Sequence, residues 1–215
     1  MARKRAATAL AAGLAMMGAA APASAHPHVW VDVNAELVFN QGKVVGVRHA
    51  WTFDDMYSAF VTANMGKDGK DPTTQDLQPV AQTNVESLKE FDYFTTPRMN
   101  GKKPPFGAPK DYSMTFDSAE RTATLHFTLP LAQPAPARLF VFQVYDPSYF
   151  VAFAFEKGEA VKLLDAPAGC SLSVTKPKAL DSEDSKKLNE SFFSGLSPGS
   201  DFGVKLADRA IVACP

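Results

Sequence analysis

The sequence has few of the features that identify enzymes or nucleic-acid-binding proteins. Its 215 residues include only two cysteines and four histidines, and 22 basic residues nearly balance 23 acidic ones. The near-neutral charge and the lack of a basic stripe exclude a nucleic-acid partner. There is no serine–histidine–aspartate nucleophile elbow, phosphate-binding glycine loop or close carboxylate pair, so we predict that the protein is not an enzyme.

The sequence also lacks a convincing membrane-spanning run. Residues 6–20 are apolar, but this segment is too short and too rich in alanine and glycine for a spanning helix. It follows the basic tripeptide RKR and precedes ASA at residues 23–25, a small-x-small cleavage signal. No cysteine adjoins this point, which argues against a lipid anchor. We predict a cleaved signal peptide over residues 1–25 and a single mature domain, residues 26–215, outside the cytoplasm.

The two cysteines, Cys170 and Cys214, both lie in the last quarter of the chain. In an oxidising compartment, a disulfide is the expected state of such a pair. Closing a loop of this length stabilises a protein by on the order of 4 kcal/mol in the chain-entropy model. We therefore predict a Cys170–Cys214 bond that ties down the C-terminus.

The first part of the mature chain alternates apolar and polar residues, as half-buried strands do. Residues 29–39 and residues 43–53 both show this period of two. Between them, Asn40-Gln41-Gly42 is expected to form a three-residue loop with glycine in the left-handed position. This loop predicts an antiparallel hairpin with Phe39 opposite Lys43 and, at its open end, Phe53 opposite Val29.

The register of this hairpin decides which polar side chains meet at its open end. Residues that face each other share one side of the sheet, so this register sets Asp54 opposite His28. His26 precedes His28 by two residues, and Asp55 follows Asp54. The sequence therefore predicts that histidines and carboxylates gather at this end.

These residues suit a transition metal. A free N-terminal His26 would offer its amine and imidazole to one ion, and His28 would complete a histidine brace. The alternative amine-terminal copper and nickel motif is excluded, because Pro27 has no N–H to deprotonate. His26 and His28 with Asp54, or with Asp55 as a substitute, form a ligand set suited to Zn²⁺, Cu²⁺, Ni²⁺ or Co²⁺.

Two further histidines occupy strand-like segments. His49 lies between Val47 and Trp51 on the apolar face, which indicates a core histidine; near a strand end it could instead be a ligand or orient one. His126 alternates with threonines on the polar face of its segment and is expected to face solvent.

After the hairpin, the pattern becomes helical. Asp54 or Asp55 can cap a helix that begins at residue 56, and a second helix, capped near Thr73 or Thr74, carries an apolar stripe to residue 91. The intervening residues 64–75 partly resemble an EF-hand calcium loop. Calcium binding is not expected, because three required ligand positions are held by Gly66, Pro72 and Gln75.

The rest of the chain consists of short strand-like segments separated by proline and glycine. The predicted strands cover residues 93–99, 112–117, 121–129, 139–145, 149–155, 161–164, 170–174 and 203–214, with a short helix near 181–189. No internal repeat or domain linker interrupts them. We predict an α+β fold, with one mostly-β domain of antiparallel, sandwich-like sheets and a two-helix insertion after the first hairpin.

Several short segments across the mature chain match the motifs of one family. They are HPHV at 26–29, RHAWTFD at 48–54, NVESLKEFDYF at 84–94, LHFTLP at 125–130, YDPSYF at 145–150, APAGC at 166–170 and CP at 214–215. In these the chain resembles a bacterial periplasmic family with a domain-of-unknown-function label, described as the periplasmic component of an uncharacterised ABC-type transport system. The resemblance implies periplasmic residence and a link to nickel, cobalt or zinc transport, but supplies no catalytic residues.

Three functions fit these observations. The first is binding of a divalent transition metal as an accessory or solute-binding component of an ABC-type transport system, with an inner-membrane transporter as partner. The chain is too short for a two-lobed receptor, which favours the accessory role. The second is a metal-free, β-rich interaction module that meets a membrane partner through exposed aromatic residues. The third is an oxidative copper enzyme that uses the histidine brace.

Overall fold

A computed structural model describes residues 27–67, 69–156, 158–178 and 202–215. The predicted signal peptide, His26 and the predicted helix near residues 181–189 therefore lie outside the described residues. In the described part, the protein is mostly β, as predicted. Among the same residues, no helix is long and apolar enough to cross a membrane.

The larger sheet contains six strands within the described residues and is built around the first hairpin. Its order is β4-β5-β2-β1-β7, and β8 also pairs with β1. The strands are β1 (Val29–Asn40), β2 (Lys43–Phe53), β4 (Lys110–Asp117), β5 (Thr122–Ala135), β7 (Val151–Phe155) and β8 (Val161–Leu164). Strands β7 and β8 follow one another along the same edge of β1 and run parallel to it. The sheet is therefore mixed, so the prediction of antiparallel sheets is confirmed only in part.

The smaller sheet has four strands in the described part of the chain, in the order β3-β6-β10-β9. They are β3 (Thr95–Met99), β6 (Leu139–Val144), β9 (Ser171–Thr175) and β10 (Arg209–Ala213), and every pairing is antiparallel. The predicted disulfide is present: Cys170 and Cys214 are bonded, with their Cα atoms 4.1 Å apart, beside the paired strands β9 and β10. Of the predicted final strand, residues 203–206 form instead a short 3₁₀ helix, η2 (Gly203–Leu206).

The two sheets contribute to one hydrophobic core. The alternating apolar residues of β1 and β2 are buried on one face and meet the buried aromatic residues of β6. The rings of Phe142 on β6 and Phe155 on β7 lie 5.7 Å apart and so join the two sheets. Because burying such a side chain contributes about 1.5–3 kcal/mol, this shared core is the main source of stability.

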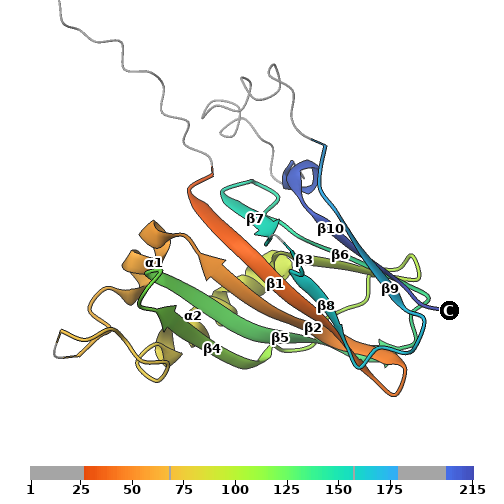
Figure 1. Ribbon diagram of the computed structural model, residues 1–215, viewed down its shortest axis with the longest axis horizontal. Helices are drawn as coiled ribbons and strands as arrows, with labels where there is room; N and C mark the ends of the chain where they lie inside the picture. Colours follow the sequence, from red (N-terminus) through yellow and green to blue (C-terminus); the bar gives the residue numbers. More distant parts are fainter. Residues whose placement is uncertain (1–26, 68, 157, 179–201) are drawn as a thin grey trace, which may run out of the picture.

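Helical segments lie between β2 and β3 in the chain and cover the β4–β5 side of the larger sheet (Figure 1). They are α1 (Asp55–Thr62), α2 (Gln78–Leu88) and the 3₁₀ segment η1 (Lys89–Phe94). The carboxylate of Asp54 caps α1, as predicted. Helix α2 starts later than predicted because Thr73 bonds to Asp76 in a preceding turn, and Pro79 occupies its first turn.

The hairpin of β1 and β2 has a different register from the one predicted. Asn40 pairs with Lys43, so the turn has only two residues, Gln41 and Gly42, both with positive φ (48° and 75°). A bulge between Val38 and Phe39 then shifts the pairing further. As a result, Phe53 lies opposite Val31 rather than Val29. The total shift is two residues, so each side chain remains on its predicted face.

Candidate functional site

The open end of the hairpin is closed by Asp54. Its Oδ2 accepts a hydrogen bond from the backbone N–H of Trp30 (2.8 Å), and its own N–H donates to the Trp30 carbonyl (3.0 Å). Its Oδ1 accepts from the N–H of Tyr57 (2.8 Å) in the first turn of α1. Asp54 therefore faces Trp30, and the predicted direct opposition of Asp54 and His28 is wrong, because the turn and bulge move the register by two residues.

His28 nevertheless lies on the same side of the hairpin as Asp54, as its diagonal neighbour. Such neighbours are roughly 7–8 Å apart, a span that long side chains can bridge. The backbone N–H of His28 donates to the carbonyl of Phe150 (2.8 Å), and the two rings stack with centroids 4.5 Å apart. The imidazole is thus held against the loop between β6 and β7.

The other two ligands predicted for this end of the hairpin are Asp55 and His26. Asp55 is exposed at the start of α1, and its Oδ1 accepts from the N–H of Met56 (2.9 Å). His26 lies outside the described residues. Within the described residues, no group of three histidine, cysteine, aspartate or glutamate side chains is arranged to hold a metal ion.

His49 lies inside the core, 1% exposed, on the opposite side of the sheet from His28 and Asp54. Its Nδ1 accepts a hydrogen bond from Trp51 Nε1 (3.3 Å), and its Nε2 lies 3.3 Å from Thr95 Oγ1. Thr95 Oγ1 in turn donates to the carbonyl of Tyr93 (2.9 Å). This chain of contacts links the two sheets and occupies both ring nitrogens, so the structure supports the core interpretation of His49.

Burial lowers the pKa of His49 from 6.5 to about 3. The unfolded chain therefore binds a proton below about pH 6.5 that the folded protein does not bind, so acid favours unfolding. We expect this residue to reduce stability by about 1.4 kcal/mol per pH unit as the pH falls from 6.5 towards 3. Urea titrations from about pH 7 to about pH 4 should show a steeper acid loss for the native protein than for His49→Gln. Parallel curves would contradict the assignment.

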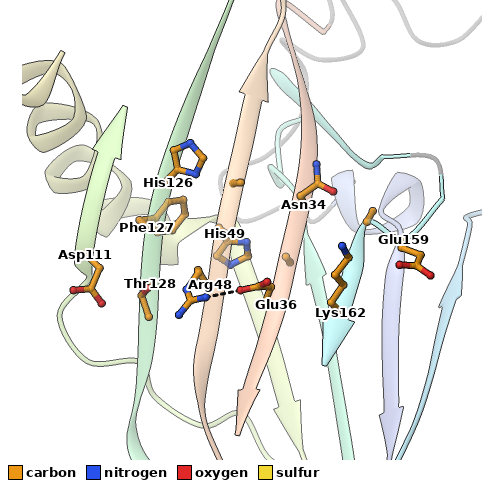
Figure 2. Close-up of a pocket in the computed structure, with 13 residues that line it drawn as sticks. Asn34, Glu36, Arg48, His49, Asp111, His126, Phe127, Thr128, Glu159 and Lys162 are labelled. Carbon is orange, nitrogen blue, oxygen red and sulfur yellow. Dashed lines mark hydrogen bonds and ion pairs between the residues drawn. The ribbon is translucent and has the colours of Figure 1, made fainter. Parts of the chain in front are cut away.

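A polar hollow of about 560 Å³ lies on the outer face of the larger sheet, away from the open end of the hairpin (Figure 2). Its charged lining residues have both signs, and Arg48 forms an ion pair with Glu36 (2.6 Å) across β1 and β2. His126 also lines it, half-buried, with Nε2 3.0 Å from Thr115 Oγ1, so it is less solvent-facing than predicted. Burial lowers its pKa. This hollow offers mixed charge rather than a clustered metal-ligand set.

A third feature, which the sequence analysis missed, is an apolar pocket of about 450 Å³. We call it the aromatic pocket. It lies between the inner face of the larger sheet, the α2–η1 segment and the β6–β7 loop, and its ring-bearing lining residues are Trp51, Phe53, Tyr57, Phe91, Phe94, Phe150 and Phe153. These residues are scattered along the sequence, but the motifs EFDYF and YDPSYF each contribute to the wall and could have indicated it.

One wall of the aromatic pocket has a strained backbone. Asp92, Tyr93 and Phe94 are consecutive non-glycine residues in the left-handed region, with φ of 50°, 54° and 46°. The α-helix itself ends at Leu88, earlier than the predicted end at residue 91, and η1 contains non-helical φ/ψ angles from Phe91 onward. Residues in this region persist only where their surroundings hold them, and they concentrate at ligand-binding sites. The contact chain from His49 through Thr95 to Tyr93 provides that support.

The opposite wall of the pocket is the β6–β7 loop, which Asp146 organises. This buried carboxylate accepts hydrogen bonds from the N–H and hydroxyl of Ser148 (both 2.8 Å) and from the N–H of Val151 (3.0 Å). Gly203 packs behind the loop, and its N–H donates to the carbonyl of Pro147 (3.1 Å). Asp146 is therefore a structural residue.

Comparison with known proteins gives two matches. A family model described as "Protein of unknown function (DUF1007)" matches residues 11–214. A protein of Haemophilus influenzae, described as "Uncharacterized protein", is 24% identical over 192 residues, which cover 88% of this chain and 91% of the relative. The similarity thus extends over both sheets and the helical segments.

Proposed function

Because this chain belongs to the DUF1007 family of proteins of unknown function, we propose its function from its own residues, as a periplasmic protein that binds a divalent transition metal. The observation that carries the proposal is the double hydrogen bond between Asp54 and Trp30, which brings the start of β1 beside the start of α1. His28 and the carboxylates of Asp54 and Asp55 thereby lie at the same end of the sheet.

The chemistry of these groups fits Zn²⁺, Ni²⁺, Co²⁺ or Cu²⁺. Each carboxylate oxygen of Asp54 accepts one N–H, which leaves it capacity for a further partner. In the proposed ligand set, His26 supplies its amine and imidazole, His28 supplies a second imidazole, and Asp54 or Asp55 supplies an oxygen. His49 is not included, because its side chain lies in the core on the other side of the sheet.

We propose a role in transport rather than catalysis. The site would lie at an exposed strand end, where an ion can enter and leave, whereas structural metal sites are closed by four protein ligands. The metal would then be cargo, which the protein passes to or receives from an inner-membrane transporter of the ABC type. A copper oxidase would use the same histidines, but no further observation favours that reaction.

The proposal is tested by metal titration of protein purified with its native N-terminus. We expect His28→Ala, and a version with one extra residue before His26, to bind about 100-fold more weakly, since each loses a nitrogen ligand. Asp54→Asn keeps the oxygen that caps α1 but sets its NH2 group against the N–H of Trp30, and should lose about tenfold. His126→Ala, which changes a histidine at a distance, serves as the control and should bind as the native protein does.

Isothermal titration calorimetry with Zn²⁺, Ni²⁺, Co²⁺ and Cu²⁺ provides the measurement. Binding should weaken in acid, because nitrogen and oxygen ligands must be deprotonated to hold a metal ion. Equal affinities for the native, N-extended and His28→Ala proteins would refute the ligand set.

A further inference from the structure

We propose that the aromatic pocket is a docking site for a partner protein, and that it receives an apolar segment flanked by lysine or arginine residues. This proposal uses Asp54 and Asp55, which are also proposed metal ligands, but it does not require a bound metal. It rests on the lining of the pocket, on the exposed rings at its mouth, and on the charge of the residues around it.

The pocket is suited to an apolar guest because its own polar atoms already bond to each other. The hydroxyl of Tyr57 donates to Asn84 Oδ1 (3.2 Å), and Asn84 Nδ2 donates to the carbonyl of Val80 (2.9 Å). On the other side, Ser148 Oγ donates to the Asp146 carboxylate (2.8 Å). A guest therefore meets mainly carbon atoms and gains affinity by burying its own apolar surface.

The surroundings of the pocket indicate a macromolecule rather than a small ligand. At the mouth, Phe91 and Phe150 are 55% and 46% exposed. The apolar surface continues onto α1, where Phe60 is 76% exposed and its ring lies 6.3 Å from the ring of the lining residue Tyr57. A ligand enclosed by the pocket would leave these side chains in water, whereas a protein segment that lies across the mouth would cover them.

The charge of the residues beside the pocket indicates which kind of macromolecule would bind there. Asp54 and Asp55 follow the lining residue Phe53, and Glu90 precedes Phe91. The carboxylate of Asp54 lies beside the pocket, since its Oδ1 accepts a hydrogen bond from the N–H of the lining residue Tyr57 (2.8 Å). Lys89 is the basic residue next to these three acidic ones, so the summed charge of the four residues is negative. An anionic membrane surface would be repelled, whereas a cationic flank on a protein segment would be attracted.

The pocket is also held ready for a guest. Its left-handed wall, residues 92–94, is fixed through Thr95 to His49, and the carboxylate of Asp146 fixes its opposite wall. Aromatic side chains lose little conformational entropy on binding, and a prearranged site avoids further ordering costs. Stored backbone strain at one wall is consistent with a binding role.

The test uses a pool of short fluorescent peptides whose central three positions vary over phenylalanine, leucine, isoleucine and tryptophan, between pairs of lysines. Fluorescence anisotropy with the full mature protein in EDTA removes any contribution of a metal. We expect saturable binding, at least tenfold weaker when glutamates replace the flanking lysines. Phe91→Ser, at the mouth, should weaken binding at least tenfold, whereas Leu139→Ser, a similarly exposed apolar residue on β6 (42%), should leave it unchanged.

Several outcomes would overturn the proposal. Failure of the whole lysine-flanked pool to bind, equal binding of both charge types, or equal loss in Phe91→Ser and Leu139→Ser would each do so. Binding to vesicles of phosphatidylglycerol without binding to the peptides would assign the surface to a membrane instead. Because EDTA is present throughout, each result is independent of the metal titration.

Discussion

Replacing His49 by alanine is expected to lower the free energy of unfolding by about 4 kcal/mol. The substitution removes a side chain that is 1% exposed and stacked against Phe127, with ring centroids 5.0 Å apart. It also leaves Trp51 Nε1 without its acceptor and Thr95 Oγ1 without the His49 ring. Both the cavity and the unsatisfied buried polar atoms destabilise the folded state. The site is too deeply buried for water to enter and take over the hydrogen bonds of the imidazole.

Urea denaturation of the native and variant proteins at about pH 7 measures this effect. His126→Ala is the matched control, because His126 is only half-buried and lies near a single hydroxyl; we expect it to cost less than about 1 kcal/mol. Loss of the His49 contacts should also loosen residues 92–94, which amide hydrogen exchange would detect as faster exchange in η1 and β3. Equal stability of the two variants would show that His49 does not join the sheets.

The second large effect is expected for Gly203→Ala, at about 3 kcal/mol. A Cβ atom built on Gly203 would lie 1.8 Å from the carbonyl oxygen of Asp146 and 2.8 Å from its carbonyl carbon. Both atoms belong to the backbone, so no side chain can rotate away, and the β6–β7 loop or η2 must shift. Since Asp146 and Phe150 of this loop line the aromatic pocket, the shift should also weaken peptide binding.

Gly107→Ala is the control for this prediction. A Cβ atom at Gly107 would lie 3.5 Å from its nearest neighbour, an ordinary contact distance. Its substitution should change the free energy of unfolding by less than about 1 kcal/mol, or stabilise the protein by restricting the unfolded chain. Thermal unfolding followed by circular dichroism compares the two. If Gly203→Ala and Gly107→Ala have the same melting temperature, the close approach of Gly203 to the Asp146 carbonyl does not exclude a Cβ atom, and the prediction is wrong.

The sequence predicted most strands, because burial of one face leaves a period-two pattern that is independent of long-range pairing. It also predicted which side of the hairpin each residue occupies. It did not predict the register, because a two-residue turn and a bulge lie within the variation that Asn40-Gln41-Gly42 permits. A shift of two residues preserves the pattern of burial, so that pattern cannot reveal it.

The pairing between strands that are distant in the sequence was even harder to predict than the register of the hairpin. The residues of β7 and β8 are apolar whether they lie parallel or antiparallel to β1, so their composition does not specify their direction. The aromatic pocket could not be predicted for the same reason. Its residues Trp51, Phe94 and Phe153 come from three separate segments that only the topology brings together. The Cys170–Cys214 bond was predictable because no alternative pairing exists.

The position of β10 has a consequence for the order in which the protein assembles. It is the last strand in the chain, yet it lies between β6 and β9 in the smaller sheet. A chain that emerges from a ribosome or an export channel N-terminus first can pair the six strands of the larger sheet once Leu164 has emerged. The adjoining edges of β6 and β9 must then wait, unpaired and open to other chains, until residues 209–213 arrive. Premature termination a few residues early would therefore remove the middle of a sheet rather than its margin, and would leave Cys170 without its partner.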